Sequence, residues 1–253
     1  MKKIKDKLVD KIVLLGTVYT IGVFLAVLLN LFRVLGRIRI LHWERFPNYR
    51  CSPKLYKNGL ILVSNHPSLL EPFLLPVLFW KEYLLHPIQL SPWSTPDKVN
   101  YYDKWYWFWI RPLAIPIERG NKQEELRAFV KLRRILNSGG IVVIFPEGGR
   151  TCNGKHGEFY WSERGKKIRR LKDGVSLLVQ KTGAAVLPTW VDGAENFLPN
   201  FPNRTKLYHA FPRFREKITI KIGEPMKFEK VKSSGEISQK LATILLHSAD
   251  EEE

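Results

Sequence analysis

Residues 141–151 read IVVIFPEGGRT, an apolar run that passes directly into a loop containing a glutamate, two glycines and an arginine. A short β-branched apolar run bounded by proline and glycine is typical of a strand that is buried on both faces. Runs of the same kind occur at residues 59–64 (GLILVS), 113–117 (LAIPI), 185–191 (AVLPTWV) and 218–222 (ITIKI). Apolar residues at helical spacing separate these runs, notably at 123–137 and 171–182. The pattern predicts an α/β fold with a central, largely parallel sheet flanked by helices.

The residues that directly follow each strand are the first place to look for chemistry, because open α/β sheets bind ligands beyond the carboxyl ends of their strands. His66 and Glu71 follow the run at 59–64. Such a carboxylate can hold one ring nitrogen while the other nitrogen takes a proton from a hydroxyl group. Five positions on a regular helix would separate the two side chains by about 140°, so they meet only across a turn. Pro67 disfavours helix at His66 and fits that turn, but a structural, hydrogen-bonded histidine is the alternative.

Arginines occur at two further strand exits. Arg119 follows the LAIPI run, and Arg150 follows the IVVIF run after Glu147, Gly148 and Gly149. Paired glycines let the backbone approach a ligand closely, and a guanidinium group offers a planar fork to phosphate or carboxylate. Each arginine alone is more often a solvated surface charge. Both together, beside a His–Glu pair, indicate an anionic substrate next to a general base.

An apolar segment near the N-terminus predicts attachment to a membrane. Residues 12–32 contain no charge and, as a helix, would measure roughly 32 Å, which is enough to cross a bilayer. Gly16, Gly22 and Asn30 would also permit a bent segment in one leaflet. A cleaved signal peptide is disfavoured because the basic sequence GRIR (36–39) follows in place of a cleavage site. We therefore expect a membrane-anchoring helical segment at residues 1–40, a catalytic domain at 41–249 and a frayed acidic tail at 250–253.

The formal charge of +17 predicts anionic partners. With an apolar segment in the same chain, anionic lipid headgroups are favoured over nucleic acid as the partner. The basic residues of interest form one run: Arg164, Lys166, Lys167, Arg169, Arg170 and Lys172. Basic residues on both sides of the apolar segment leave its orientation open. Only two cysteines, Cys51 and Cys152, fit a reducing compartment, so we expect the domain on the cytoplasmic face.

Several other enzyme classes are disfavoured. A serine hydrolase would carry Gly-x-Ser-x-Gly at a strand-to-helix turn, and the sequence has none. Residues 149–155 imitate a phosphate loop, but His156 follows where serine or threonine should bind magnesium. The histidines lack the spacing of zinc ligands, so no metal is expected.

Together the motifs resemble the glycerolipid acyltransferase family typified by 1-acylglycerol-3-phosphate acyltransferase. Residues 66–71 are similar to the family's first motif, Asn-His followed by an acid, and residues 115–119 lie where its second motif ends in a substrate-binding arginine. Residues 145–151 are similar to its third motif, Phe-Pro-Glu-Gly-Thr-Arg-Ser, and residues 186–188 to its fourth. The resemblance covers roughly residues 45 to 245.

The resemblance implies an acyltransferase in which His66, oriented by Glu71, deprotonates the hydroxyl of a lysophospholipid. Its substrate-binding residues would be Arg119, Glu147, Gly148, Arg150 and Pro188. The donor would be acyl-CoA or acyl-carrier protein, with no cofactor, and the default acceptor 1-acylglycerol 3-phosphate. The family's first acid is usually aspartate and here is Glu71, while Gly149 replaces the usual threonine. Another lysolipid or aminolipid acceptor, or a catalytically silent scaffold, are the alternatives.

Overall fold

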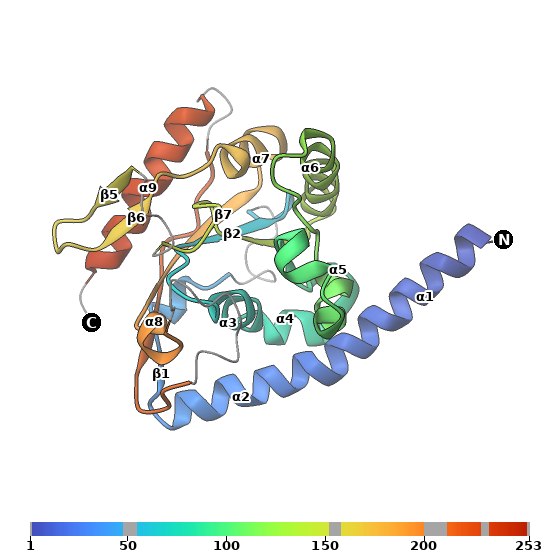
Figure 1. The fold of residues 1–253 in the computed structure, drawn as a ribbon, viewed down its shortest axis with the longest axis horizontal. Coiled ribbons are helices and arrows are strands. Elements are labelled where there is room, and N and C mark those ends of the chain that lie inside the picture. The colour runs from blue at the N-terminus through green and yellow to red at the C-terminus, as the bar shows by residue number, and fades with distance from the viewer. Residues whose placement is uncertain (1, 48–54, 152–157, 200–211, 229–232, 252–253) are drawn as a thin grey trace.

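The computed structural model describes residues 2–47, 55–151, 158–199, 212–228 and 233–251. Its centre is a six-stranded sheet in the order β1-β8-β7-β2-β4-β3 (Figure 1). The strands are β1 (Ile38–Leu41), β2 (Leu60–Ser64), β3 (Trp93–Ser94), β4 (Ile141–Ile144), β7 (Ala185–Asp192) and β8 (Ile218–Ile222). All neighbouring pairs are parallel except β7 with β8, so the expected mixed, largely parallel sheet is confirmed. A separate antiparallel hairpin is formed by β5 (Phe159–Trp161) and β6 (Lys167–Arg169).

Helices cover both faces of the sheet (Figure 1). Along β2, Leu60 and Leu62 face one core, and Ile61 and Val63 face the other. The first core is covered by α2 (Val23–Val34), α3 (Glu71–Val77) and α4 (Trp80–Leu85), and the second by α6 (Lys122–Asn137), α7 (Gly174–Thr182) and α9 (Ser234–Asp250). Shorter segments are η2 (Trp43–Arg45), α5 (Pro87–Leu90), η3 (Lys98–Tyr102), η4 (Trp105–Leu113) and α8 (Ala194–Phe197).

The strand predicted at residues 113–117 is wrong. This segment leaves η4 and makes only the single bridges Ser94↔Ala114 and Asp97↔Ile117. Prolines at 112 and 116 explain the difference, because a residue without an N–H group cannot complete a ladder. The segment nevertheless lies next to β3, so its exit still delivers Arg119 to the same edge of the sheet as the other candidates.

The ends of the predicted domain also differ from the expectation. The boundary at residue 40 falls inside β1, which pairs with β8 and is therefore part of the sheet. The acidic tail was expected to fray, but Asp250 accepts a hydrogen bond from the Ser162 hydroxyl and Glu251 forms an ion pair with Arg45. Residues 252–253 lie outside the described part of the chain, as do Cys51, Cys152 and His156.

The N-terminal segment is one long helix built from α1 (Lys2–Thr17), a π-helical turn η1 (Val18–Gly22) and α2. Residues Val9–Val34 are long and apolar enough to cross a membrane. In Figure 1 this helix runs along one edge of the domain, beneath α3 and α4. Leu14, Val18, Ala26 and Leu29 are buried against the domain. The Tyr83 hydroxyl of α4 donates to the carbonyl of Gly22 and ties the π-helical turn to the domain.

Candidate active site

The loop between β2 and α3 is held in place by a side chain that pairs with the neighbouring strand. Asn65 donates through Nδ2 to the carbonyl of Val191, and its Oδ1 accepts the N–H of Val191. These paired bonds fix the chain one residue before His66. The loop continues without helical structure until α3 begins at Glu71, which is the turn that the sequence required.

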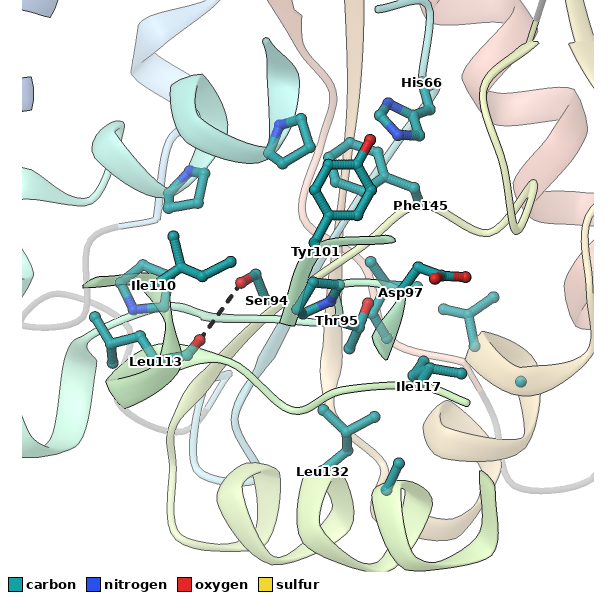
Figure 2. A pocket seen from close by; sticks show the side chains of 18 of the residues that line it. His66, Ser94, Thr95, Asp97, Tyr101, Ile110, Leu113, Ile117, Leu132 and Phe145 are labelled. Atoms are coloured by element: carbon teal, nitrogen blue, oxygen red, sulfur yellow. Dashed lines mark hydrogen bonds between the residues drawn. The ribbon is translucent and has the colours of Figure 1, made fainter. Parts of the chain in front are cut away.

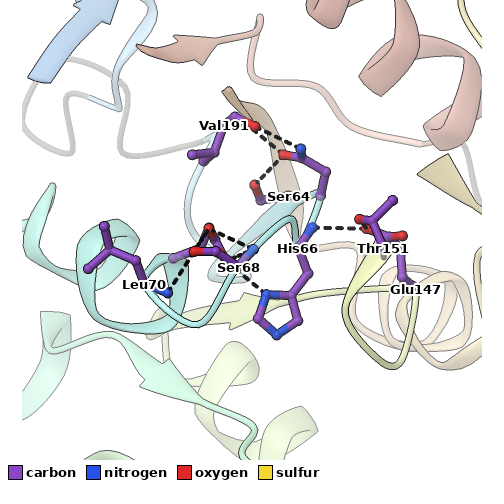
Figure 3. Close-up of polar contacts among 9 residues, drawn as sticks. Ser64, His66, Ser68, Leu70, Glu147, Thr151 and Val191 are labelled. Atoms are coloured by element: carbon purple, nitrogen blue, oxygen red, sulfur yellow. Dashed lines mark hydrogen bonds and ion pairs between the residues drawn. The ribbon is translucent and has the colours of Figure 1, made fainter. Parts of the chain in front are cut away.

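His66 and Glu71 are in direct contact across this turn. Figure 3 shows the polar contacts around His66 and Ser68. Nδ1 of His66 lies 2.9 Å from Oε2 of Glu71. The Glu71 side chain is 0% exposed, and it also accepts hydrogen bonds from Ser68. The Ser68 N–H lies 3.1 Å from both carboxylate oxygens, and its hydroxyl lies 2.7 Å from Oε1. Ser68 therefore fixes the carboxylate, and the carboxylate fixes the imidazole.

The imidazole of His66 remains accessible on its other side. Its side chain is 14% exposed, and its ring stacks on Phe145 with 4.4 Å between the ring centroids. Because Nδ1 is engaged by Glu71, Nε2 is the nitrogen left for a substrate in the cavity that His66 lines. A ring oriented in this way can take a proton at Nε2 while the carboxylate stabilises the resulting positive charge.

Glu147 is a second buried carboxylate beside His66, but it faces the protein. Its Oε1 accepts the N–H of His66 and the hydroxyl of Thr151, and its Oε2 accepts the N–H of Arg169. Burial raises the pKa of this carboxyl above its usual value, although the three hydrogen bonds act in the opposite direction. Thr151 also donates its N–H to the carbonyl of His66. Glu147, in the loop after β4, thus joins the loop after β2 to the end of β6.

A largely apolar cavity of about 920 Å³ opens beside His66. Figure 2 shows His66 and Phe145 on one side of it and Leu132 of α6 on the other. The remaining wall includes apolar residues from the N-terminal helix, α3 and α7, such as Ile21, Leu25, Phe73, Val77 and Leu178. Cavities of this size with apolar walls and a few polar groups are typical binding sites for sizeable apolar ligands. A hydrocarbon chain fits this description.

The structure brings only some of the predicted substrate-binding residues to the cavity. Arg119 and Gly148 line it, and the Nε atom of Arg119 lies 3.5 Å from Oδ2 of Asp97. Among the described residues, the lining does not include Glu147, Arg150 or Pro188. Pro188 is buried in the central strand β7, opposite Val63 of β2.

Sequence reasoning did not identify the parts played by Ser68 and Lys172. Lys172 lines the cavity, and Ser68 positions Glu71. A serine three residues before an acid that begins a helix was the available signal for Ser68. Lys172 had been assigned to the surface run of basic residues, and its place at the cavity depends on the chain folding back after the β5–β6 hairpin. Within the described ranges, no cluster of three potential metal ligands is present.

The carboxylate, the imidazole open to the cavity and the neighbouring cations form an arrangement that can support base-assisted transfer to an amphipathic substrate. The family model described as Acyltransferase matches residues 37–192, which is more than half of the chain. The chain belongs to this family, and the protein is an acyltransferase. The resemblance noted in the sequence is confirmed.

A solved structure gives the same fold. The crystal structure of the 1-acyl-sn-glycerophosphate (LPA) acyltransferase PlsC from Thermotoga maritima matches with a TM-score of 0.54 and 20% sequence identity. The match covers 98% of this chain and 97% of that chain. The shared architecture therefore includes the N-terminal apolar helix as well as the sheet.

Proposed function

We propose that this acyltransferase moves a fatty acyl group from acyl-CoA or acyl-carrier protein to the hydroxyl of 1-acylglycerol 3-phosphate, which gives phosphatidic acid. The observation that carries the proposal is the 2.9 Å contact between His66 Nδ1 and Glu71 Oε2 at the wall of a large apolar cavity. The contact supplies a base, and the cavity supplies room for acyl chains.

In the proposed reaction, Nε2 of His66 takes the proton of the acceptor hydroxyl as the oxygen attacks the thioester carbonyl carbon. A C–O bond forms, the C–S bond breaks, and the thiolate leaves with the proton that the imidazolium returns. Glu71 remains ionised and stabilises the imidazolium. The chemistry uses neither an acyl-enzyme intermediate nor a cofactor.

Two observations support an anionic lipid acceptor. Arg119 and Lys172 are both in the cavity wall with His66, so positive charge lies near the proposed base. The apolar part of the wall extends from this charged region to the N-terminal helix at Ile21 and Leu25. An acceptor with a negative headgroup and an apolar tail would match both parts of the cavity.

We further propose that the protein lies in one leaflet of the cytoplasmic face of a membrane. The N-terminal helix packs on the domain, with α1 against α5 and η4 and α2 against α3 and β1. Its outer side exposes apolar residues, and so do α5 and η4 beside it. The residues that would enter the lipid include Phe24, Val27, Leu31, Ile88, Trp105 and Phe108. Amphipathic surfaces of this kind lie in the interfacial plane of a bilayer, so the helix can attach to the membrane without crossing it.

The aromatic block at residues 101–109 contains both packed and exposed rings. Trp107 stacks with Phe73 of α3 and Trp109 packs against the same ring at a tilt, whereas Trp105 and Phe108 are exposed. Exposed aromatic rings beside an apolar helix suit the interfacial region of a bilayer. The basic β5–β6 hairpin lies on the opposite side of the molecule from α1 in Figure 1. We therefore assign contact with the bilayer to the N-terminal helix and η4.

The experiment that tests the reaction uses purified full-length protein with labelled acyl-CoA and acyl-carrier protein. The acceptors are 1-acylglycerol 3-phosphate, a lysophospholipid with a phosphodiester headgroup, an aminolipid and monoacylglycerol. Labelled phosphatidic acid as the main product is the expected result. Preference for the phosphodiester or the aminolipid would replace the acceptor assignment, and no product from any pair would indicate the silent scaffold.

A further inference from the structure

We propose that Arg169 and Lys172 bind the acceptor's phosphate together with Arg119, so that the site selects a phosphomonoester headgroup. This inference rests on the proposed function and deepens it. Neither residue belongs to the motifs discussed above: Arg169 ends β6, and Lys172 lies just before α7. Both side chains lie against the two consecutive glycines that follow Glu147.

Gly148 and Gly149 leave space that the two cationic side chains occupy. Gly148 has a φ of +67°, and a side chain added there would begin 2.5 Å from Cε of Lys172 and 3.0 Å from its Nζ. A side chain added at Gly149 would begin 3.3 Å from Nη1 of Arg169 and 4.0 Å from Nη1 of Arg119. Three cationic groups therefore gather above a two-glycine turn that lines the cavity.

The charges of Arg169 and Lys172 are available to a ligand. Within the described ranges, neither the guanidinium of Arg169 nor the ammonium of Lys172 has a carboxylate partner, whereas Arg119 already faces Asp97 at 3.5 Å. The main chain of both residues is fixed, because the Arg169 N–H donates to Glu147 and the Lys172 N–H donates to the carbonyl of Pro146. Like-charged side chains held together without a counterion form a favourable site for an anion.

The start of α7 adds to this positive region. Gly174 and Val175 in its first turn line the cavity. Asp173 at the N-cap makes no side-chain bond to the helix; its carboxylate accepts from the Ser238 hydroxyl instead. The first N–H groups of α7 therefore have no side-chain partner at the cap and lie beside the same cavity as Lys172.

The number of cations distinguishes a phosphomonoester from other headgroups. A phosphomonoester carries a charge of about −1.5 to −2 at pH 7, and a phosphodiester carries only one negative charge. Arg119 alone, already paired with Asp97, would not balance the monoester. With Arg169 and Lys172 added, the positive charge of the site matches the negative charge of the phosphomonoester. Arg119 and Arg169 then both offer forked donors to the phosphate oxygens. A zwitterionic headgroup would bring its own cation into this cluster and be repelled.

The test compares Arg169→Gln and Lys172→Gln with Arg170→Gln. All three variants remove one positive charge, but Arg170 forms an exposed ion pair with Glu158 on the hairpin. Binding of 1-acylglycerol 3-phosphate and of monoacylglycerol is measured by calorimetry in the same neutral detergent. We expect each of the first two variants to weaken binding of the phosphate acceptor by about tenfold, with monoacylglycerol binding unchanged. Arg170→Gln should bind both ligands like the wild type.

Unchanged affinity of Arg169→Gln and Lys172→Gln for the phosphate acceptor would overturn the inference, and so would an equal loss in Arg170→Gln. In transfer assays, the two variants should raise KM for the phosphate acceptor and leave kcat largely unchanged. These outcomes are separable from failure of the proposed function. Selective loss of binding in a protein that transfers nothing would contradict the reaction and leave the phosphate site standing. Transfer that is insensitive to both substitutions would contradict the phosphate site and leave the proposed reaction standing.

Discussion

Nδ1 of His66 and Oε2 of Glu71 lie 2.9 Å apart although His66 lies in the loop after β2 and Glu71 begins α3. The contact depends on Ser68, whose N–H and hydroxyl hold the carboxylate from the other side. The extra methylene of glutamate, compared with the aspartate usual in the resembling family, is therefore accommodated by a carboxylate that has four hydrogen-bond contacts and no exposure. The site therefore holds the longer side chain of Glu71 with its carboxylate fully buried and hydrogen-bonded.

Shortening the acid should uncouple it from the ring. In Glu71→Asp the carboxylate retracts by one methylene, so it can reach Ser68 or His66 but not both in the present backbone. We expect kcat to fall by about tenfold, which corresponds to the loss of one charge-assisted hydrogen bond, with little change in KM. Steady-state kinetics on 1-acylglycerol 3-phosphate check this. Activity equal to or above that of the wild type would show that the glutamate is tolerated without being required.

Glu147 should make stability depend on pH. Its pKa is raised by burial, so the fold favours the neutral acid, and this contribution is complete below the unfolded-state pKa of about 4.3. As the pH rises through the raised pKa, the contribution is lost. The free energy of unfolding of the wild type should therefore decrease relative to that of Glu147→Gln between pH 4 and neutral pH. Denaturant titrations at several pH values measure the difference, and a flat or rising difference would contradict the prediction.

Attachment to lipid should depend on the exposed rings of η4. Trp105 and Phe108 are 79% and 64% exposed. Replacing both with serine should weaken binding to anionic vesicles by about a hundredfold, since burying one large apolar side chain contributes roughly 1.5–3 kcal/mol. Vesicle flotation gives the bound fraction. Trp161→Ser is the matched control, because this ring is 61% exposed but lies on the β5–β6 hairpin. An equal effect of both changes would remove η4 from the lipid-binding surface.

The sequence predicted the parts of the fold that depend on local pattern. The buried runs that form β2, β4 and β7 are largely apolar, β8 alternates isoleucine with Thr219 and Lys221, and α6 shows a regular apolar stripe. In contrast, β1 reads IRIL and its pairing with β8 joins residues 180 positions apart, which no local pattern encodes. The LAIPI run failed as a strand because hydropathy does not register the missing N–H groups of proline.

The same distinction applies to the site. The contact between His66 and Glu71 could be predicted from the sequence because only a short turn separates the two residues. Glu147 was predicted to bind substrate, but its oxygens accept the backbone N–H groups of His66, in the loop after β2, and of Arg169, at the end of β6. Long-range hydrogen bonds of this kind leave no mark in the local sequence. For the same reason the sequence alone groups Lys172 with the surface charges, whereas the fold places its side chain over Gly148.

The central claim is that His66 is the base that starts acyl transfer. The most direct measurement is the single-turnover rate of His66→Ala with labelled acyl thioester and saturating 1-acylglycerol 3-phosphate, beside His247→Ala, whose side chain is 78% exposed on α9. Loss of a general base predicts a rate about 10² to 10⁴ times lower in His66→Ala, with a thermal unfolding profile like that of the wild type and full activity in His247→Ala. A His66→Ala protein that transfers at the wild-type rate would contradict the account.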